Sequence, residues 1–332
     1  MIYGIAAMAD RLAENREELK KCVHLESDRM ITAGAAVLTC QGMRADRRVF
    51  DECSGILKKN TGALSEYRGM IRIPLLCRMI VSGTPEFYLQ SVQQIEDRIR
   101  HTQKIRSASK IYRILAAMTV FEHSGQRSAA ETVERMRELY VEMKTEHPWL
   151  TGEEDLPFAA LLAASDREVR RAMDDAEACN SILRNYFRSG DVRQTVSHVL
   201  ALTEEDAEAK CMRAADLAEE LKRMGHKIST GRESVILGAA ALTGVPAGIM
   251  AEAIAEADEC LKQKKGFGNL SAGTQQRRMF AGLLAIRSLD ADRDASAAVS
   301  TAVAVQTALE IQMQVCVMLM MSSSAAAASA ST

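Results

Sequence analysis

One short pattern returns about every forty residues along this chain: an apolar segment of small side chains that ends in Leu-Thr or a close variant. Its anchor residues lie at positions 38, 80, 118, 162, 202, 242 and 284, so successive anchors are separated by 42, 38, 44, 40, 40 and 42 residues. A repeat of this length is typical of stacked helical hairpins, because one hairpin cannot bury its apolar face alone. The repeat therefore predicts a modular architecture of helices.

Composition and periodicity favour helix over strand. The chain has 332 residues, of which 47% are hydrophobic and 4% aromatic, with only 5 prolines. Apolar residues recur three or four positions apart in the segments between anchors, as at Tyr88, Val92, Ile95 and Ile99, which is the spacing of a half-buried helix. We expect an all-α fold, a right-handed, solenoid-like array of about seven helical hairpins that resembles HEAT repeats.

The repeat also sets the expected boundaries. Residues 1–28 are predicted to form an N-terminal capping helix, 29–290 the hairpin array, 291–321 a long C-terminal helix and 322–332 a disordered Ser/Ala tail. The anchors Leu202 and Leu242 should be buried between adjacent hairpins. The apolar C-terminal helix is expected to pack on the array, with contact to a membrane or a partner as the alternatives. Polar residues interrupt it, so no membrane span is expected.

Sequence motifs for catalysis and for metal binding are missing. The chain has no C-x-x-C pair, no H-E-x-x-H and no P-loop order. Acidic clusters follow Thr151 and Thr203 at the spacing of a helix N-terminal capping box, which explains them without chemistry. We therefore expect no catalytic, cofactor-binding or metal-ligating residues and no cofactor. Scattered cysteines and the lack of a signal peptide predict a cytoplasmic location.

Charge is distributed unevenly along the chain. Residues 29–113 hold 15 basic and 7 acidic residues, whereas the whole chain has a net charge of −2. Within this part, one run of cations contains no acid. Such a run is typical of a solvated loop, but it also suits a polyanion or an acidic protein surface. The candidate polyanion-binding residues are Arg98, Arg100, Lys104, Arg106, Lys110 and Arg113.

One family resemblance accompanies these features. The run Lys58-Lys59-Asn60-Thr61-Gly62, Arg68-Gly69, the apolar segments Ile71–Ile80 and Ile111–Val120, and the Ala/Ser-rich tail resemble an uncharacterised bacterial family, the domain of unknown function numbered 4003. The resemblance covers most of the chain after about residue 25. It implies an all-helical, cytosolic bacterial protein and transfers no catalytic residues.

Three functions are compatible with the sequence. The first is a non-catalytic binding or scaffold protein with an unknown protein or peptide partner, which is the usual role of helical-repeat surfaces. The second is binding of nucleic acid or another polyanion through the basic first repeats, although the overall acidic balance and scarce aromatics disfavour nucleic acid. The third is an enzyme whose active site lies inside a helical toroid, which would require paired carboxylates facing one another.

Overall fold

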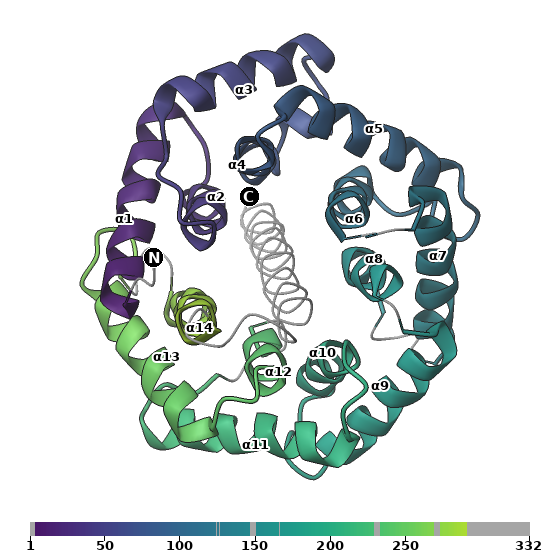
Figure 1. Cartoon of the computed structure of the whole chain (residues 1–332), viewed down its shortest axis with the longest axis vertical. Coiled ribbons are helices and arrows are strands. Elements are labelled where there is room, and N and C mark those ends of the chain that lie inside the picture. The colour runs from purple at the N-terminus through teal and green to yellow at the C-terminus, as the bar shows by residue number, and fades with distance from the viewer. Residues whose placement is uncertain are drawn as a thin grey trace, which may run out of the picture.

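Two concentric belts of helices form the molecule (Figure 1). The structure is a computed structural model that describes residues 4–123, 125, 127–146, 151–165, 167–228, 233–268 and 273–290. Outer and inner helices alternate along the chain. The outer helices are α1 (Ile5–Cys22), α3 (Arg47–Asn60), α5 (Pro85–His101), α7 (Ala129–Glu146), α9 (Val169–Leu183), α11 (Ala207–Arg223) and α13 (Ala247–Lys262). The inner helices are α2 (Asp28–Cys40), α4 (Arg72–Ser82), α6 (Lys110–His123), α8 (Leu156–Ala164), α10 (Gly190–Leu200), α12 (Val235–Leu242) and α14 (Thr274–Asp290).

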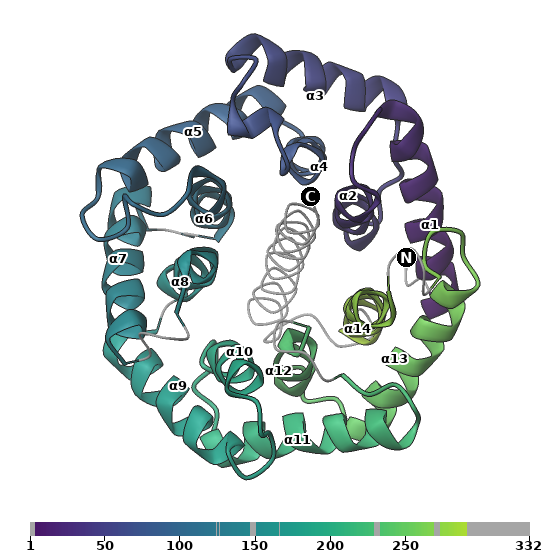
Figure 2. The same ribbon diagram turned by 180° about the vertical axis from the view of Figure 1, so that it is seen from behind.

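The belts close into a ring, as Figure 2 shows from the opposite side. Helix α1 packs against α13 and α14, the last hairpin of the described chain. Two ion pairs join this seam, Lys264 to Asp10 at 2.5 Å and Lys265 to Glu17 at 3.1 Å. We call each outer helix together with the inner helix that follows it one unit. The units are numbered 1 to 7, from α1/α2 to α13/α14.

The inner helices are apolar because they are covered on nearly every side. Every residue of α12 is buried, as are all residues of α8 except the last. Six of the seven repeat anchors lie within the inner helices, and the seventh, Leu202, lies two residues beyond α10. Leu242 is buried as predicted, whereas Leu202 is only half-buried because α10 has already ended. The forty-residue pattern thus marks the inner belt.

Glycine permits the closest approaches between inner helices. A Cβ atom on Gly34 of α2 would lie 2.8 Å from Ile73 Cγ2 and 2.9 Å from Cys77 Sγ of α4. A Cβ atom on Gly238 of α12 would lie 2.9 Å from Val199 Cβ of α10. Any larger side chain at either position would push the two helices apart, so glycine sets these spacings.

The outer helices are amphipathic, with one stripe turned to the inner belt. In α5 this stripe includes Tyr88, Val92, Ile95 and Ile99, as the sequence predicts, while the opposite face is exposed. Acidic side chains begin several outer helices: Asp46 accepts from the Arg48 N–H at 2.7 Å, and Asp206 accepts from the Ala209 N–H at 2.9 Å. Such caps satisfy the first unpaired N–H groups of a helix and complement its dipole.

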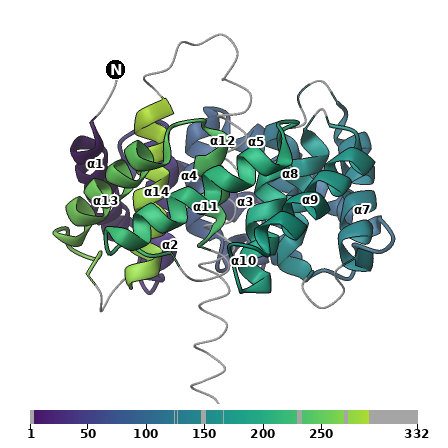
Figure 3. The same ribbon diagram turned by 90° about the horizontal axis from the view of Figure 1, so that it is seen from below.

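The connections divide between the two rims of the ring, which Figure 3 shows from the side. The connections from each outer helix to its inner helix form what we call the loop rim; those of units 1 to 3 are residues 23–27, 61–71 and 102–109. The loop rim also contains the short helices η1 (Glu66–Arg68) and η2 (Glu153–Asp155). The connections from each inner helix to the next outer helix, such as 83–84 and 243–246, form what we call the turn rim.

Arginine side chains close the inner helices at the turn rim. Arg135 Nε donates to the Ala163 carbonyl at 3.0 Å, Arg213 Nε donates to the Ala241 carbonyl at 2.8 Å, and Arg287 Nε donates to the Cys40 carbonyl at 3.0 Å. Each accepting carbonyl lies at or next to the C-terminal end of an inner helix, where helical partners are lacking. A guanidinium there also complements the negative end of the helix dipole.

These observations confirm the all-helical class and change the expected arrangement. The hairpins close into a ring instead of extending as a solenoid-like array, because α1 fits against α13. Helix α1, expected within a capping segment at 1–28, is the outer helix of unit 1. Helix α14 reaches Asp290, the last residue of the described chain, and the boundary at 290 stays a prediction. The C-terminal helix at 291–321 and the tail at 322–332 lie outside the described residues.

Candidate anion-binding face on the loop rim

The loops of units 1 to 4 are joined side by side along the loop rim. Arg72, which begins α4, pairs with Glu26 of the preceding unit at 3.0 Å. Lys110, which begins α6, lies with its Nζ 5.4 Å from the centre of the Tyr67 ring in unit 2. The Ser109 N–H donates to Glu153 Oε2 in unit 4 at 2.8 Å. These contacts make the rim one continuous surface.

A repeated arginine holds individual loops on this rim. It is the fourth residue of α6, α10 and α14: Arg113, Arg193 and Arg277. Arg113 donates to the Arg106 carbonyl at 3.2 Å and also to the Ala108 carbonyl. Arg193 donates to the carbonyls of Phe187 and Arg188 at 2.9 and 2.8 Å, and Arg277 to the Phe267 carbonyl at 3.2 Å. Each guanidinium thus anchors the loop that precedes its own helix.

The six residues predicted to bind a polyanion divide into two groups. Arg98, Lys104 and Arg106 are exposed, and no acidic group of the described chain lies within ion-pair distance of them. The other three are engaged. Arg100 pairs with Asp97, Lys110 lies over the Tyr67 ring, and Arg113 pairs with Glu96 at 2.9 Å.

The pairing at Arg100 neutralises it. The hydrogen bond from Arg100 lowers the pKa of Asp97, so both groups are charged at neutral pH and cancel. Only a small part of the Arg113 side chain is exposed, because its guanidinium donates to the loop carbonyls from beneath. Arg113 therefore positions the loop at 102–109, and both arginines add little to the surface charge.

Unit 2 contributes cations that the acid-free run did not include. Lys58 and Lys59 are exposed in the last turn of α3, and Arg68 is half-exposed in η1. A hydrogen bond of 3.2 Å from Gln93 Nε2 to the Asn60 carbonyl brings the end of α3 against α5. The unpaired cations of units 2 and 3 form what we call the basic loop face, which comprises Lys58, Lys59, Arg68, Arg98, Lys104 and Arg106.

The charge of the basic loop face follows from helix polarity. Cations stabilise the C-terminal turn of a helix, and the last turns of α3 and α5 each carry them. The helices α4 and α6 begin at the same rim, and neither has an acidic residue in its first turn. The positive ends of these two inner helices therefore add to the field of the side chains. The face ends at unit 4, where η2 contributes Glu153, Glu154 and Asp155.

Aromatic side chains are withdrawn from the basic loop face. Tyr67, in the middle of η1, is only 3% exposed, and its hydroxyl has no hydrogen-bond partner. Burial, reinforced by the nearby Glu96, raises the pKa of Tyr67 above its usual range, so the hydroxyl stays protonated. A ring in this position packs the loop and cannot stack on a nucleic-acid base.

Two leucines project fully from the loops next to this face. Leu25 is 107% exposed and Leu64 is 100% exposed, relative to an extended reference chain. Leu25 has a φ of 59°, and Lys104 has a φ of 72°. Side chains other than glycine pay about 1–2 kcal/mol for this left-handed conformation. Strain of this kind concentrates at functional sites.

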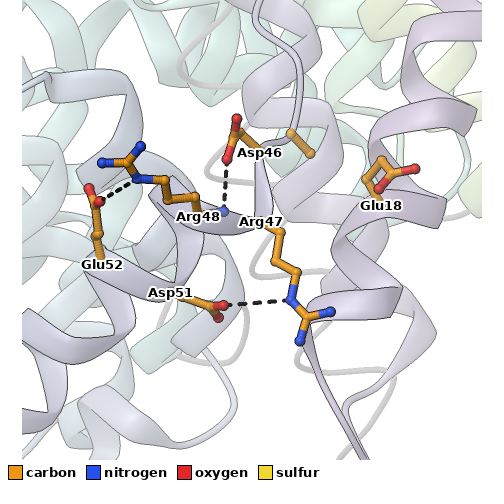
Figure 4. A pocket seen from close by; sticks show the side chains of 7 residues that line it. Glu18, Asp46, Arg47, Arg48, Asp51 and Glu52 are labelled. Carbon is orange, nitrogen blue, oxygen red and sulfur yellow. Dashed lines mark hydrogen bonds and ion pairs between the residues drawn. The ribbon is translucent and has the colours of Figure 1, made fainter.

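A cleft of about 870 Å³ lies between α1 and α3 near the turn rim (Figure 4). Its charged side chains are occupied with one another, with the backbone or, for Glu18, with Lys21 at 2.5 Å. Arg47 pairs with Asp51 at 3.6 Å, Arg48 pairs with Glu52 at 3.2 Å, and Asp46 caps α3. The lining contains no histidine or cysteine. The cleft therefore offers no nucleophile and no unpaired general acid or base.

A buried carboxylate under units 6 and 7 forms the most crowded charge cluster. Asp258 accepts from Arg277 Nε at 2.6 Å, from His226 Nδ1 at 2.8 Å and from Arg278 Nε at 3.3 Å. Burial would raise the pKa of Asp258, but these hydrogen bonds outweigh it and hold the pKa below its ordinary value. His226, Asp258 and Glu259 have the spacing of a metal site. The two guanidinium groups already compensate Asp258 and would repel a dication.

The ring places no facing pair of free carboxylates at its centre within the residues described. The carboxylates of the inner helices whose side chains are described are Asp28, Glu122 and Asp191. Asp28 pairs with Arg16 and Lys20, and Glu122 pairs with Arg78. Asp191 lies in the first turn of α10 at the loop rim. The described side chains of the inner helices therefore include no pair of free carboxylates of the kind that sugar cleavage requires.

No helix in the described part of the chain combines the length and apolar character that crossing a bilayer requires. No solved structure matches the chain.

A search among curated proteins and family models gives its relatives. An uncharacterised protein named YeaA from Bacillus subtilis (strain 168) is 25% identical over 197 residues. That alignment covers 58% of this chain and 58% of the relative, so the chain spans well under two thirds of the protein that it matches. The family model described as "Protein of unknown function (DUF4003)" matches residues 15–316. That range includes all of the ring from the middle of α1 onward, and the chain belongs to this family.

Proposed function

We propose that this protein is a non-catalytic binding protein that holds an anionic partner on the basic loop face. The supporting observation is that six cations of units 2 and 3 reach the surface without an ion-pair partner in the described chain. Lys58, Lys59 and Arg98 lie in the last turns of α3 and α5, whereas Arg68, Lys104 and Arg106 lie in loops that are anchored from beneath. Anchored loops lose little conformational freedom on binding, which lowers the cost of association. Lysine and arginine in such an arrangement can neutralise phosphate or carboxylate groups.

The absence of chemical groups around this face supports binding over catalysis. Near this face, the carboxylates Glu96 and Asp97 of α5 are both paired with arginine, and Glu66 of η1 is exposed without a second carboxylate in the same loop. His101 lies 3.5 Å from Asp97 on the exposed side of α5 and faces no nucleophile. A protein or peptide partner with an acidic surface fits the same face, and steering by charge would speed its association.

Heparin serves as a soluble anionic probe for this proposal. Full-length protein should be retained on immobilised heparin at about 25 mM salt and should elute as salt rises, because each neutralised group releases counterions. Lys104→Ala/Arg106→Ala should elute markedly earlier. The matched control is Arg44→Ala/Arg47→Ala, which removes the same charge from the turn rim and should elute like wild type. Equal elution of the two double variants would show that net charge, and not the basic loop face, governs retention.

A further inference from the structure

We infer that the loop rim of units 1 to 3 docks on an anionic lipid bilayer, with Leu25 and Leu64 entering the interface between its cations and the headgroups. This inference rests on the proposed function, since the basic loop face supplies the attraction. It adds a partner class that the charges alone do not specify.

The two leucines share one rim and have fixed positions. Leu25 lies in the connection at 23–27 and Leu64 in the connection at 61–71. Glu26, next to Leu25, pairs with Arg72 of unit 2 at 3.0 Å, so the first connection is tied to the unit that carries Leu64. Both side chains therefore project from adjacent loops of the same rigid surface.

Their exposure exceeds that of other large apolar side chains in the described chain. Phe87, Ile249 and Met212 are 62%, 52% and 49% exposed, and each lies on an outer helix with part of its surface packed. Leu25 and Leu64 have no such packing. The left-handed backbone at Leu25 is a position where glycine would be favoured. A leucine that is strained and unpacked gains nothing from the fold, so its side chain is available for a partner.

A bilayer fits this combination better than a soluble polyanion. Peripheral membrane attachment ordinarily needs two signals, apolar insertion and cationic attraction to anionic headgroups. The loop rim presents both on adjacent units, since the leucines lie in units 1 and 2 and the exposed cations Lys58, Lys59 and Lys104 lie in units 2 and 3. Binding of single-stranded nucleic acid would require exposed aromatic rings between the cations, and Tyr67 is buried instead.

Vesicle flotation with full-length protein tests the inference. Vesicles of phosphatidylcholine with about one third phosphatidylglycerol should carry the protein at low salt, and vesicles of pure phosphatidylcholine should not. Leu25→Ser/Leu64→Ser should weaken partition by on the order of tenfold or more, with unchanged retention on heparin. The matched control Met212→Ser/Ile249→Ser removes two exposed apolar side chains from the outer belt and should float like wild type.

The outcomes separate this inference from the proposed function. Heparin retention without flotation on anionic vesicles would overturn the bilayer as partner and leave anionic binding intact. If the wild-type protein neither binds heparin nor floats with anionic vesicles, both the proposed function and the bilayer inference are overturned. Flotation that persists in the double leucine variant would overturn the role of Leu25 and Leu64. A thermal melt of each variant confirms that the ring is folded, which we expect because all four substituted side chains are exposed.

Discussion

The two rims of the ring use arginine in similar ways but differ in the charges that they leave at the surface. At the turn rim, the carbonyls that end the inner helices accept hydrogen bonds from Arg135, Arg213 and Arg287, which leaves the acidic caps of the outer helices at the surface. At the loop rim, loop carbonyls accept hydrogen bonds from Arg113 and Arg193, which leaves the cations in the last turns of the outer helices at the surface. Helix polarity therefore gives the ring an electrical polarity that a net charge of −2 conceals.

The largest expected effect lies in the buried charge cluster behind the turn rim. Lys210 is completely buried and donates to Asp175 at 2.6 Å, and Arg167 pairs with the same carboxylate at 2.8 Å. Asp175→Ala leaves both cations without their partner and should lower the free energy of unfolding by about 3–5 kcal/mol. Urea unfolding measures this change. Asp174→Ala, which breaks an exposed pair with Arg170, is the control and should cost less than about 1 kcal/mol.

Asp258 provides the corresponding test beneath the loop rim. Its pKa in the folded protein lies below its ordinary value of 3.8, so protonation favours the unfolded state. The stability that it contributes is present above that value and is lost as pH falls through the folded pKa. Asp258→Asn should cost about 1.5–3 kcal/mol at pH 7. It should also flatten the fall in stability between about pH 5 and pH 3. An unchanged pH dependence would show that other carboxylates dominate acid unfolding.

A direct comparison of the two rims comes from their arginines. Arg135→Ala at the turn rim and Arg193→Ala at the loop rim should each lower the free energy of unfolding by about 1–3 kcal/mol, because the part-buried carbonyls of Ala163 and Phe187 lose charged donors. Denaturant midpoints measured under identical conditions test this equivalence. If one variant has the same stability as the wild-type protein, arginine–carbonyl hydrogen bonds stabilise only one rim, and the two rims do not use arginine in similar ways.

The smallest effect concerns the strained loop residue. Leu25→Gly relieves the left-handed backbone and should raise the free energy of unfolding by about 0.5–1 kcal/mol. The same variant should bind anionic vesicles more weakly. That result would show that Leu25 both carries the backbone strain and contributes to membrane binding. Leu64 does not have a positive φ, so Leu64→Gly should not stabilise the protein. A destabilised Leu25→Gly variant in thermal melts would remove the strain argument.

The sequence predicted the helical class and the period because the apolar inner helices repeat at regular intervals. The anchors fall on the inner belt, with Leu202 alone beyond its helix. Closure could not be predicted, because it depends on small rotations between neighbouring hairpins that no single residue specifies. The acid-free run placed Arg98, Lys104 and Arg106 on the surface, but it could not show that Arg113 turns beneath the loop.

The loop arginine escaped sequence analysis for a related reason. Arg113, Arg193 and Arg277 share the fourth position of an inner helix. Their distances to the next anchors, at 118, 202 and 284, differ from one unit to another. When the repeats are aligned by their anchor residues, these three arginines fall at different positions, so the repeat pattern does not reveal them. The family membership, by contrast, was predictable from short segments between residues 58 and 120, and the match to residues 15–316 confirms it.

Ring closure also has a consequence for the order of events during synthesis. The ion pair between Glu17 and Lys265 joins residues that are 248 positions apart, so the outer edge of α1 has no partner until α13 and the loop after it have been made. At about 5–20 residues per second, that interval lasts about 12–50 s. During this time the nascent chain is an open arc with one unmatched end. The last hairpin therefore completes the first, and a chain truncated before α13 should expose α1 to other molecules instead of forming a smaller ring.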